Sequence, residues 1–95
     1  MNDRLLPWTG PEGKPCYLFG DGAGYVSRLA DQIESVQLGM ADGLLDHADE
    51  LLAERRLTGE ELRYLARRLS ESLRDVKRVA ESRGARLARR PPPPG

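Results

Sequence analysis

The chain has 95 residues, of which 39% are hydrophobic and 32% are charged, and its formal net charge is zero. This length allows one small domain with a modest core. No apolar run approaches the roughly 18 residues that a membrane helix needs, and the N-terminus lacks the apolar stretch of a secretory signal. The single Cys16 cannot form an internal disulfide, which fits a reducing compartment. We therefore expect a cytoplasmic protein without a membrane segment.

The first 24 residues differ in composition from the rest of the chain. They contain five of the ten glycines and three of the seven prolines. This density is incompatible with a helix and predicts turns and short extended pieces. Residues 16–19 and 24–27 flank the sequence GDGA, so we expect an N-terminal arm, residues 1–24, with one short β-hairpin at these glycines. An irregular arm that packs over the helices is the alternative.

A helical period begins near Tyr25 and predicts a first helix over residues 25–55. Thr58 and Glu61 then have the spacing of a capping box, which predicts a second helix over residues 59–90. A proline-rich tail, residues 91–95, ends it. Two long helices of about 45 Å joined by a short link form an antiparallel hairpin. Its core is predicted to contain seven apolar residues, namely Val26, Ile33, Val36, Met40, Leu65, Leu69 and Val76.

The first helix carries a second apolar stripe beside the one that faces its partner. The two stripes together cover roughly 200° of its circumference, which is more than one antiparallel helix can shield. We therefore predict that the arm or another chain covers the second stripe, and favour a homodimer that forms a four-helix bundle. A heterologous helix in the same groove is a further alternative. The stripe consists of Leu38, Ala41, Leu45, Ala48 and Leu52.

Gly39 and Gly43 lie four residues apart on one flank of the first helix. Each lowers helix propensity by about 1 kcal/mol relative to alanine. They could allow another backbone to approach closely, as part of the same interface, or they could mark a weak or kinked point that divides the helix. The sequence does not decide between these alternatives.

Charge is strongly segregated along the chain. Residues 21–54 contain eight acids and one base, whereas residues 63–90 contain ten bases and three acids. Such blocks favour pairing of the first helix with the second, although each exposed pair contributes only about 0–1 kcal/mol. The basic helix also presents a row of arginines that could contact phosphates, with weak sequence discrimination. The row consists of Arg63, Arg67, Arg74 and Arg78.

No residue pattern indicates catalysis, a metal site or a cofactor. The sequence GDGAGY resembles a dinucleotide-binding loop, but Tyr25 replaces the third glycine and only helices follow, so a plain turn is expected. His47 has Gly43 and Leu51 at its helical neighbour positions, and we expect it in the core or an interface rather than on a metal. One histidine and one cysteine on unlike elements make no catalytic pair.

The segments PWTGPEGKPCYL and GYVSRLADQIESVQLGMADGLLDHA are similar to those of short actinobacterial proteins of unknown function. The resemblance covers residues 1–88 and implies no activity, ligand or functional residue. The residues themselves predict a non-enzymatic regulatory or adaptor protein that acts through helix association. The alternative is a binder of nucleic acid or another polyanion that uses the second helix.

Overall fold

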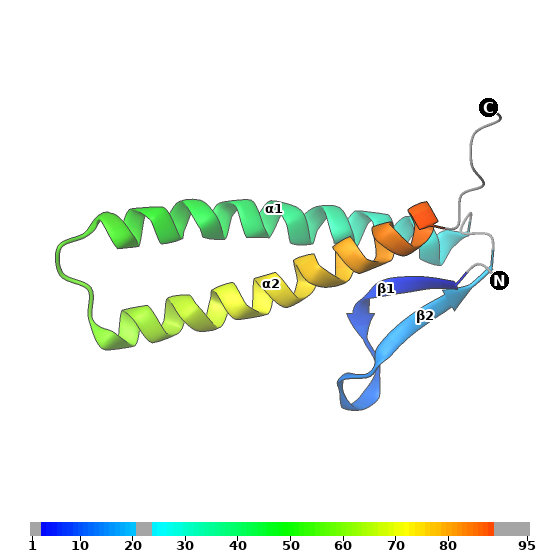
Figure 1. Ribbon diagram of the computed structural model, residues 1–95, viewed down its shortest axis with the longest axis horizontal. Coiled ribbons are helices and arrows are strands. Elements are labelled where there is room, and N and C mark those ends of the chain that lie inside the picture. Colours follow the sequence, from blue (N-terminus) through cyan, green and yellow to red (C-terminus); the bar gives the residue numbers. More distant parts are fainter. Residues whose placement is uncertain (1–2, 21–23, 89–95) are drawn as a thin grey trace.

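The computed structural model describes residues 3–20 and 24–88. The described chain is mainly helical, with two helices and a short N-terminal antiparallel sheet of two strands (Figure 1). The helices form a long hairpin, and the sheet lies beside α2 at the end away from the turn between the helices. The proline-rich tail lies outside the described residues. The elements are β1 (Asp3–Thr9), a 3-10 turn (Pro11–Gly13), β2 (Pro15–Phe19), α1 (Tyr25–Ala53) and α2 (Gly59–Ala88).

The predicted β-hairpin exists, and residues 16–19 form one of its strands as predicted, but its other strand is Asp3–Thr9 and not the predicted segment 24–27. Its strands pair Leu5 with Tyr17, and the connection spans Gly10 to Lys14, whose backbones join through a 2.7 Å hydrogen bond. Glu12 and Gly13 adopt positive φ angles of 61° and 73°, which close this turn. Glycine accepts such angles without steric cost. The segment 24–27, predicted as a strand, instead caps and begins α1, because its apolar residues join the helical period.

The predicted helix hairpin is confirmed, and so is the capping box that starts α2. The Thr58 hydroxyl accepts the Glu61 amide at 3.1 Å, and the Glu61 carboxylate accepts the Thr58 amide at 3.4 Å. These two bonds satisfy backbone donors at a helix N-terminus. Glu60 and Glu61 also place negative charge in the first turn, where it interacts favourably with the positive end of the helix dipole. The position at which α2 starts is thus specified by residues within its own first turn.

The contact between α1 and α2 uses the middle of the wide apolar arc of α1. Ala30 and Ala48 of α1 are buried there, as are Leu65 and Val79 of α2. The prediction of a core containing Val36 and Met40 was wrong. Val36 is 60% exposed and Met40 is 58% exposed, and Val26 is also at the surface, whereas Ile33, Leu69 and Val76 are half-buried. Because α2 packs between the two stripes of α1, an edge of each stripe stays exposed.

Polar side chains fasten β1 to both helices. Arg4 donates to the Ser27 hydroxyl at 2.6 Å, to Asp31 at 2.6 Å and to Glu34 at 3.3 Å. On the other helix, the Ser82 hydroxyl donates to the Leu5 carbonyl at 2.9 Å. Both Arg4 and Glu34 are buried. The sheet is therefore held by directional bonds at one end of the hairpin and does not extend along it.

Among residues 3–20 and 24–88, neither helix has a stretch long and apolar enough to cross a membrane.

Candidate functional site: an apolar groove between the helices

An open apolar groove of about 610 Å³ runs between α1 and α2. Most of its lining is aliphatic, and its walls come from both helices. Leu45 is 56% exposed and Leu73 is 68% exposed, so the groove leaves large side chains in contact with water. We call it the leucine groove. Its lining residues are Leu38, Ala41, Asp42, Leu44, Leu45, Leu69, Ser72, Leu73 and Val76.

The N-terminal sheet does not cover the leucine groove. The residues of α2 that bond to β1 are Ser82 and Arg78, which donate to the carbonyls of Leu5 and Pro7. Ser82 follows Leu73 by nine positions, which at about 100° per residue places it on the opposite side of α2. The alternative in which the arm covers the second stripe is therefore wrong for Leu45 and for Leu52, which is 64% exposed.

The five residues of the second stripe do not share one environment. Ala48 is 5% exposed and belongs to the contact between the helices. Leu38 and Ala41 are half-buried in the wall of the groove, and Leu45 projects from it. Leu52 is exposed nearer the turn. The stripe thus contributes one side of the groove, while Leu69, Leu73 and Val76 of α2 contribute the other.

Gly39 and Gly43 lie outside the leucine groove. α1 continues unbroken through both of them, so the alternative in which they divide this helix is wrong. A Cβ atom added at either position would meet no atom within 4 Å, so neither glycine serves a close approach inside the described chain. The prediction that both are interface residues therefore applies only to a contact with another molecule.

Replacing Gly43 by alanine is expected to stabilise the protein by about 0.5–1 kcal/mol, because alanine restricts the unfolded chain and favours the helix. Chemical denaturation of the wild type and of Gly43→Ala at equal protein concentration measures this change. Gly39→Ala should behave in the same way. A loss of association on either substitution would instead place these glycines at a close contact between molecules.

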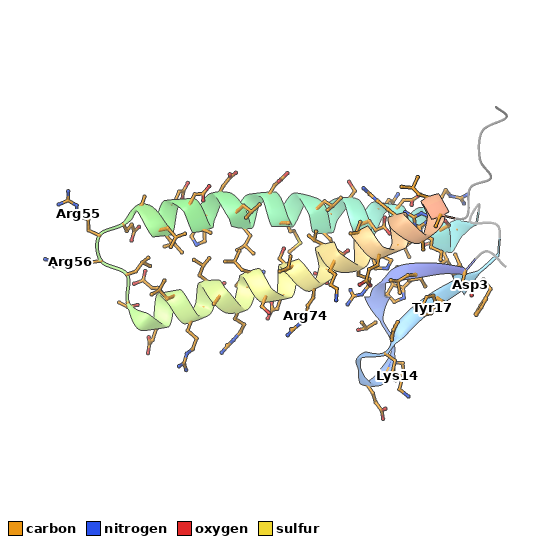
Figure 2. The ribbon with its side chains drawn as sticks, viewed as in Figure 1. Asp3, Lys14, Tyr17, Arg55, Arg56 and Arg74 are labelled. Carbon is orange, nitrogen blue, oxygen red and sulfur yellow. The ribbon has the colours of Figure 1, made fainter. Side chains whose placement is uncertain are left out.

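The arginine row splits into two groups. Arg63, Arg67 and Arg74 are exposed, and no ion pair within the described chain involves them. Arg74 points away from α1 (Figure 2). Arg78 is half-buried and bonds to Asp75 and to the Pro7 carbonyl, each at 3.3 Å. It is therefore partly committed to holding the sheet.

A second cleft, of about 250 Å³, lies between the sheet and α2. Arg74, Lys77 and Arg78 line it from the helix, and Tyr17 lines it from β2. Glu81 also lines the cleft and lies 3.7 Å from the Lys77 amine. Lys77 pairs with Glu81 and Arg78 with Asp75, so the excess positive charge of this cleft comes from Arg74, and it suits an anionic ligand.

The side chains that could act as catalytic groups or metal ligands lie apart from one another. His47 was expected in the core or an interface; it is exposed, which excludes the core of the described chain, and it lines a shallow hollow with Leu51 and Tyr64 near the turn. Cys16 is half-buried in β2. Within the described ranges, no three His, Cys, Asp or Glu side chains gather as metal ligands would. The centre of the GDGAGY loop, residues 21–23, lies outside the described residues.

Sequence reasoning missed two features of this surface. Leu69 and Val76 are predicted core residues, but they also line the groove, because the edge of the α2 stripe reaches past α1. The position of Leu73 in the same stripe is the signal that could have shown this. The buried pair of Arg4 and Glu34 had no such signal, because isolated charged residues are usually solvated.

The chain matches no protein-family model, no curated protein and no solved structure.

Proposed function

We propose that this is a non-enzymatic regulatory or adaptor protein that acts through helix-to-helix association, with the leucine groove as its contact surface and a homodimer as the assembly. The observation that carries this proposal is the exposure of Leu45 and Leu73 in one continuous groove on the side opposite the sheet. Burying apolar area stabilises association by about 25 cal/mol per Å² removed from water. Exposed apolar surfaces of this kind mark interaction sites.

Four-helix packing supports the homodimer. A hairpin of two helices encloses little core, and such hairpins commonly pair into bundles. The side chains that project from the groove walls of one copy can pack into the groove of a second copy. A two-fold contact uses the same surface on both copies, so one groove can supply both halves of the contact. In the bundle, Leu38, Leu45 and Leu52 of each copy would become core residues.

The wild-type protein is expected to be a dimer in sedimentation or light-scattering measurements over a concentration series. Leu45→Asp should weaken the dimer by at least about 100-fold, because it buries an unpaired carboxylate in each half of the contact. Val36→Asp is the matched control. Val36 is similarly exposed, at 60%, but lies nine positions away, on the opposite side of α1.

Circular dichroism of both variants tests whether the hairpin stays folded. A helical Leu45→Asp monomer beside a Val36→Asp dimer supports the proposal. A wild type that is monomeric at the highest concentration, or a dimer that both variants leave intact, overturns it.

The second candidate function is polyanion binding. The cleft lined by Arg74, Lys77 and Arg78 favours it, together with the exposed Arg63 and Arg67 on the same helix. Phosphate contacts of this kind have a steep dependence on salt. Titration with duplex DNA at two salt concentrations tests this alternative, and absence of binding at low salt rejects it.

A further inference from the structure

One edge of strand β2 is not paired within the described chain. The sheet has two strands, and β1 lies on the side of β2 that faces the helices (Figure 1). We propose that an extended segment of a partner protein adds to the open edge of β2 as a third strand and carries an acidic side chain toward α2. This surface goes beyond the proposed function, because it belongs to the sheet and not to the leucine groove.

The backbone groups of Tyr17 and Phe19 point toward the open edge. The Lys14 carbonyl accepts the Gly10 amide at 2.7 Å, so the extended residue Lys14 faces β1. In an antiparallel pair, the N–H and C=O groups of successive residues point to alternate sides of the strand. β2 follows Lys14 directly and is unbroken over Pro15–Phe19, so its first, third and fifth residues face away from β1.

The partner strand indicates the same direction. Leu5 is the residue opposite Tyr17, and its carbonyl accepts the Ser82 hydroxyl of α2 at 2.9 Å. A carbonyl that points to a helix and away from the partner strand belongs to a pair without backbone hydrogen bonds, and both members of such a pair point outward. Gln37 of α1 donates to the Pro7 carbonyl of β1 at 2.8 Å as well. Helix side chains therefore occupy the outer edge of β1, and of the two described strands only β2 offers an open edge.

The open edge lacks the charged side chains that commonly prevent strand addition. The five residues of β2, PCYLF, include no charge, and Pro15 removes a backbone donor only at the first position. Tyr17 is 52% exposed and Phe19 is 70% exposed. Aromatic side chains pair favourably with β-branched or aromatic residues on a neighbouring strand. A third strand would thus cover apolar surface and bond to the outward backbone groups together.

The charge beside the sheet favours an acidic segment. Tyr17 and Arg74 line the same cleft between the sheet and α2. Arg74 is exposed and forms no ion pair within the described chain, whereas Lys77 already pairs with Glu81 at 3.7 Å. A residue opposite Tyr17 on an added strand lies about 5.5 Å away and projects its side chain from the same face of the sheet. A carboxylate at that position meets the charge of Arg74, and β2 of a second copy has no acid to place there.

Binding of short labelled peptides to the full-length protein tests the proposal. The probes are peptides of about seven residues, alternating valine and threonine, with glutamate, glutamine or lysine at the centre, and fluorescence anisotropy measures their binding. We expect the glutamate peptide to bind about 2–5-fold more tightly than the glutamine peptide, because an exposed ion pair contributes little. Arg74→Gln should remove this preference. Arg63→Gln makes the same change at an exposed position of α2 outside the cleft and should preserve it.

Phe19→Pro tests the backbone contact. The N–H group of Phe19 points to the open edge, so proline removes a donor to the peptide and no bond to β1, and edge strands tolerate proline at such positions. Phe19→Val is the matched control, because it also removes the aromatic ring but keeps the N–H group. We expect Phe19→Pro to bind the glutamate peptide about 3–10-fold more weakly than Phe19→Val. Circular dichroism of both variants checks that the fold is kept.

Amide hydrogen exchange identifies what occupies the edge. In the free protein we expect the amides of Tyr17 and Phe19 to exchange quickly and that of Leu18 slowly, and saturating glutamate peptide should slow the first two. Protection of Tyr17 and Phe19 that increases with protein concentration without peptide would assign the edge to a second copy and overturn the proposal.

The peptide measurements also separate this inference from the proposed function. Equal binding by Phe19→Pro and Phe19→Val, or no binding of any of the three peptides, overturns strand addition and leaves the leucine groove untouched. Leu45→Asp should bind the glutamate peptide as the wild type does, because the groove lies on the side of α2 opposite the sheet. A wild type that is monomeric but binds the peptide overturns the dimer alone.

Discussion

Replacing Glu34 by glutamine is expected to lower the free energy of unfolding by about 3 kcal/mol, because it removes the only fully buried acid from a cluster of arginines in the described chain. One carboxylate oxygen of Glu34 lies 3.3 Å from the Arg4 guanidinium. The other lies 3.6 Å from Arg83 and 3.7 Å from Arg86. Glutamine keeps the size of the side chain but presents an amide to these donors, and Arg4 retains only Asp31 as an ionic partner.

Thermal or urea unfolding measures the effect, at a fixed protein concentration because the proposed dimer would also contribute to stability. Glu50→Gln makes the same chemical change at an exposed position of α1 and should alter stability by less than about 0.5 kcal/mol. A double-mutant cycle with Arg4→Met should show coupling between Arg4 and Glu34, since removing both partners leaves no buried charge unpaired between them. If Glu34→Gln is as mild as Glu50→Gln, the cluster does not hold the sheet to the helices.

Leu65→Ala should lower the free energy of unfolding by about 2–4 kcal/mol, because it opens a cavity where the hairpin has little other core. Leu65 is 4% exposed, and in the halves of the helices next to the turn only Leu65 and Ala48 are buried among the described residues. For a chain of this size, such a loss lowers the melting temperature by roughly 10–20 °C.

Leu87→Ala is the matched control for Leu65→Ala. It makes the same change in the same helix, but Leu87 is 63% exposed, so the expected loss is below about 1 kcal/mol. Equal effects of the two substitutions would show that the contact between α1 and α2 near the turn is not the core described above. Circular dichroism during melting reports directly on the helices that this contact joins.

The sequence by itself determined the elements whose signals are local. The step of three and four residues after Tyr25 predicted α1, because a helix repeats every 3.6 residues whatever packs against it. Thr58 and Glu61 predicted the start of α2, because the capping bonds form within one turn. The width of the apolar arc of α1 also predicted that one partner helix would leave part of it uncovered.

Tertiary structure decided which residues of that arc are covered. Helical phase places Val36, Met40 and Leu45 on an apolar face, but only the approach of α2 over Ala30 and Ala48 determines that all three lie at exposed edges. The strand over residues 16–19 was predicted, but its partner was misplaced because Pro7 and the short run before Gly10 give a weak strand signal, and their pairing with residues 15–19 depends on register. Small residues let the two helices approach closely, and that approach leaves the leucine groove open.

The burial of Glu34 lay beyond any local pattern. Its partners, Arg4, Arg83 and Arg86, come from β1 and from the far end of α2, and only the folded chain brings them to one carboxylate. A buried charge is stable only when such partners surround it, so its position is a property of the tertiary structure and not of the residues around it in sequence.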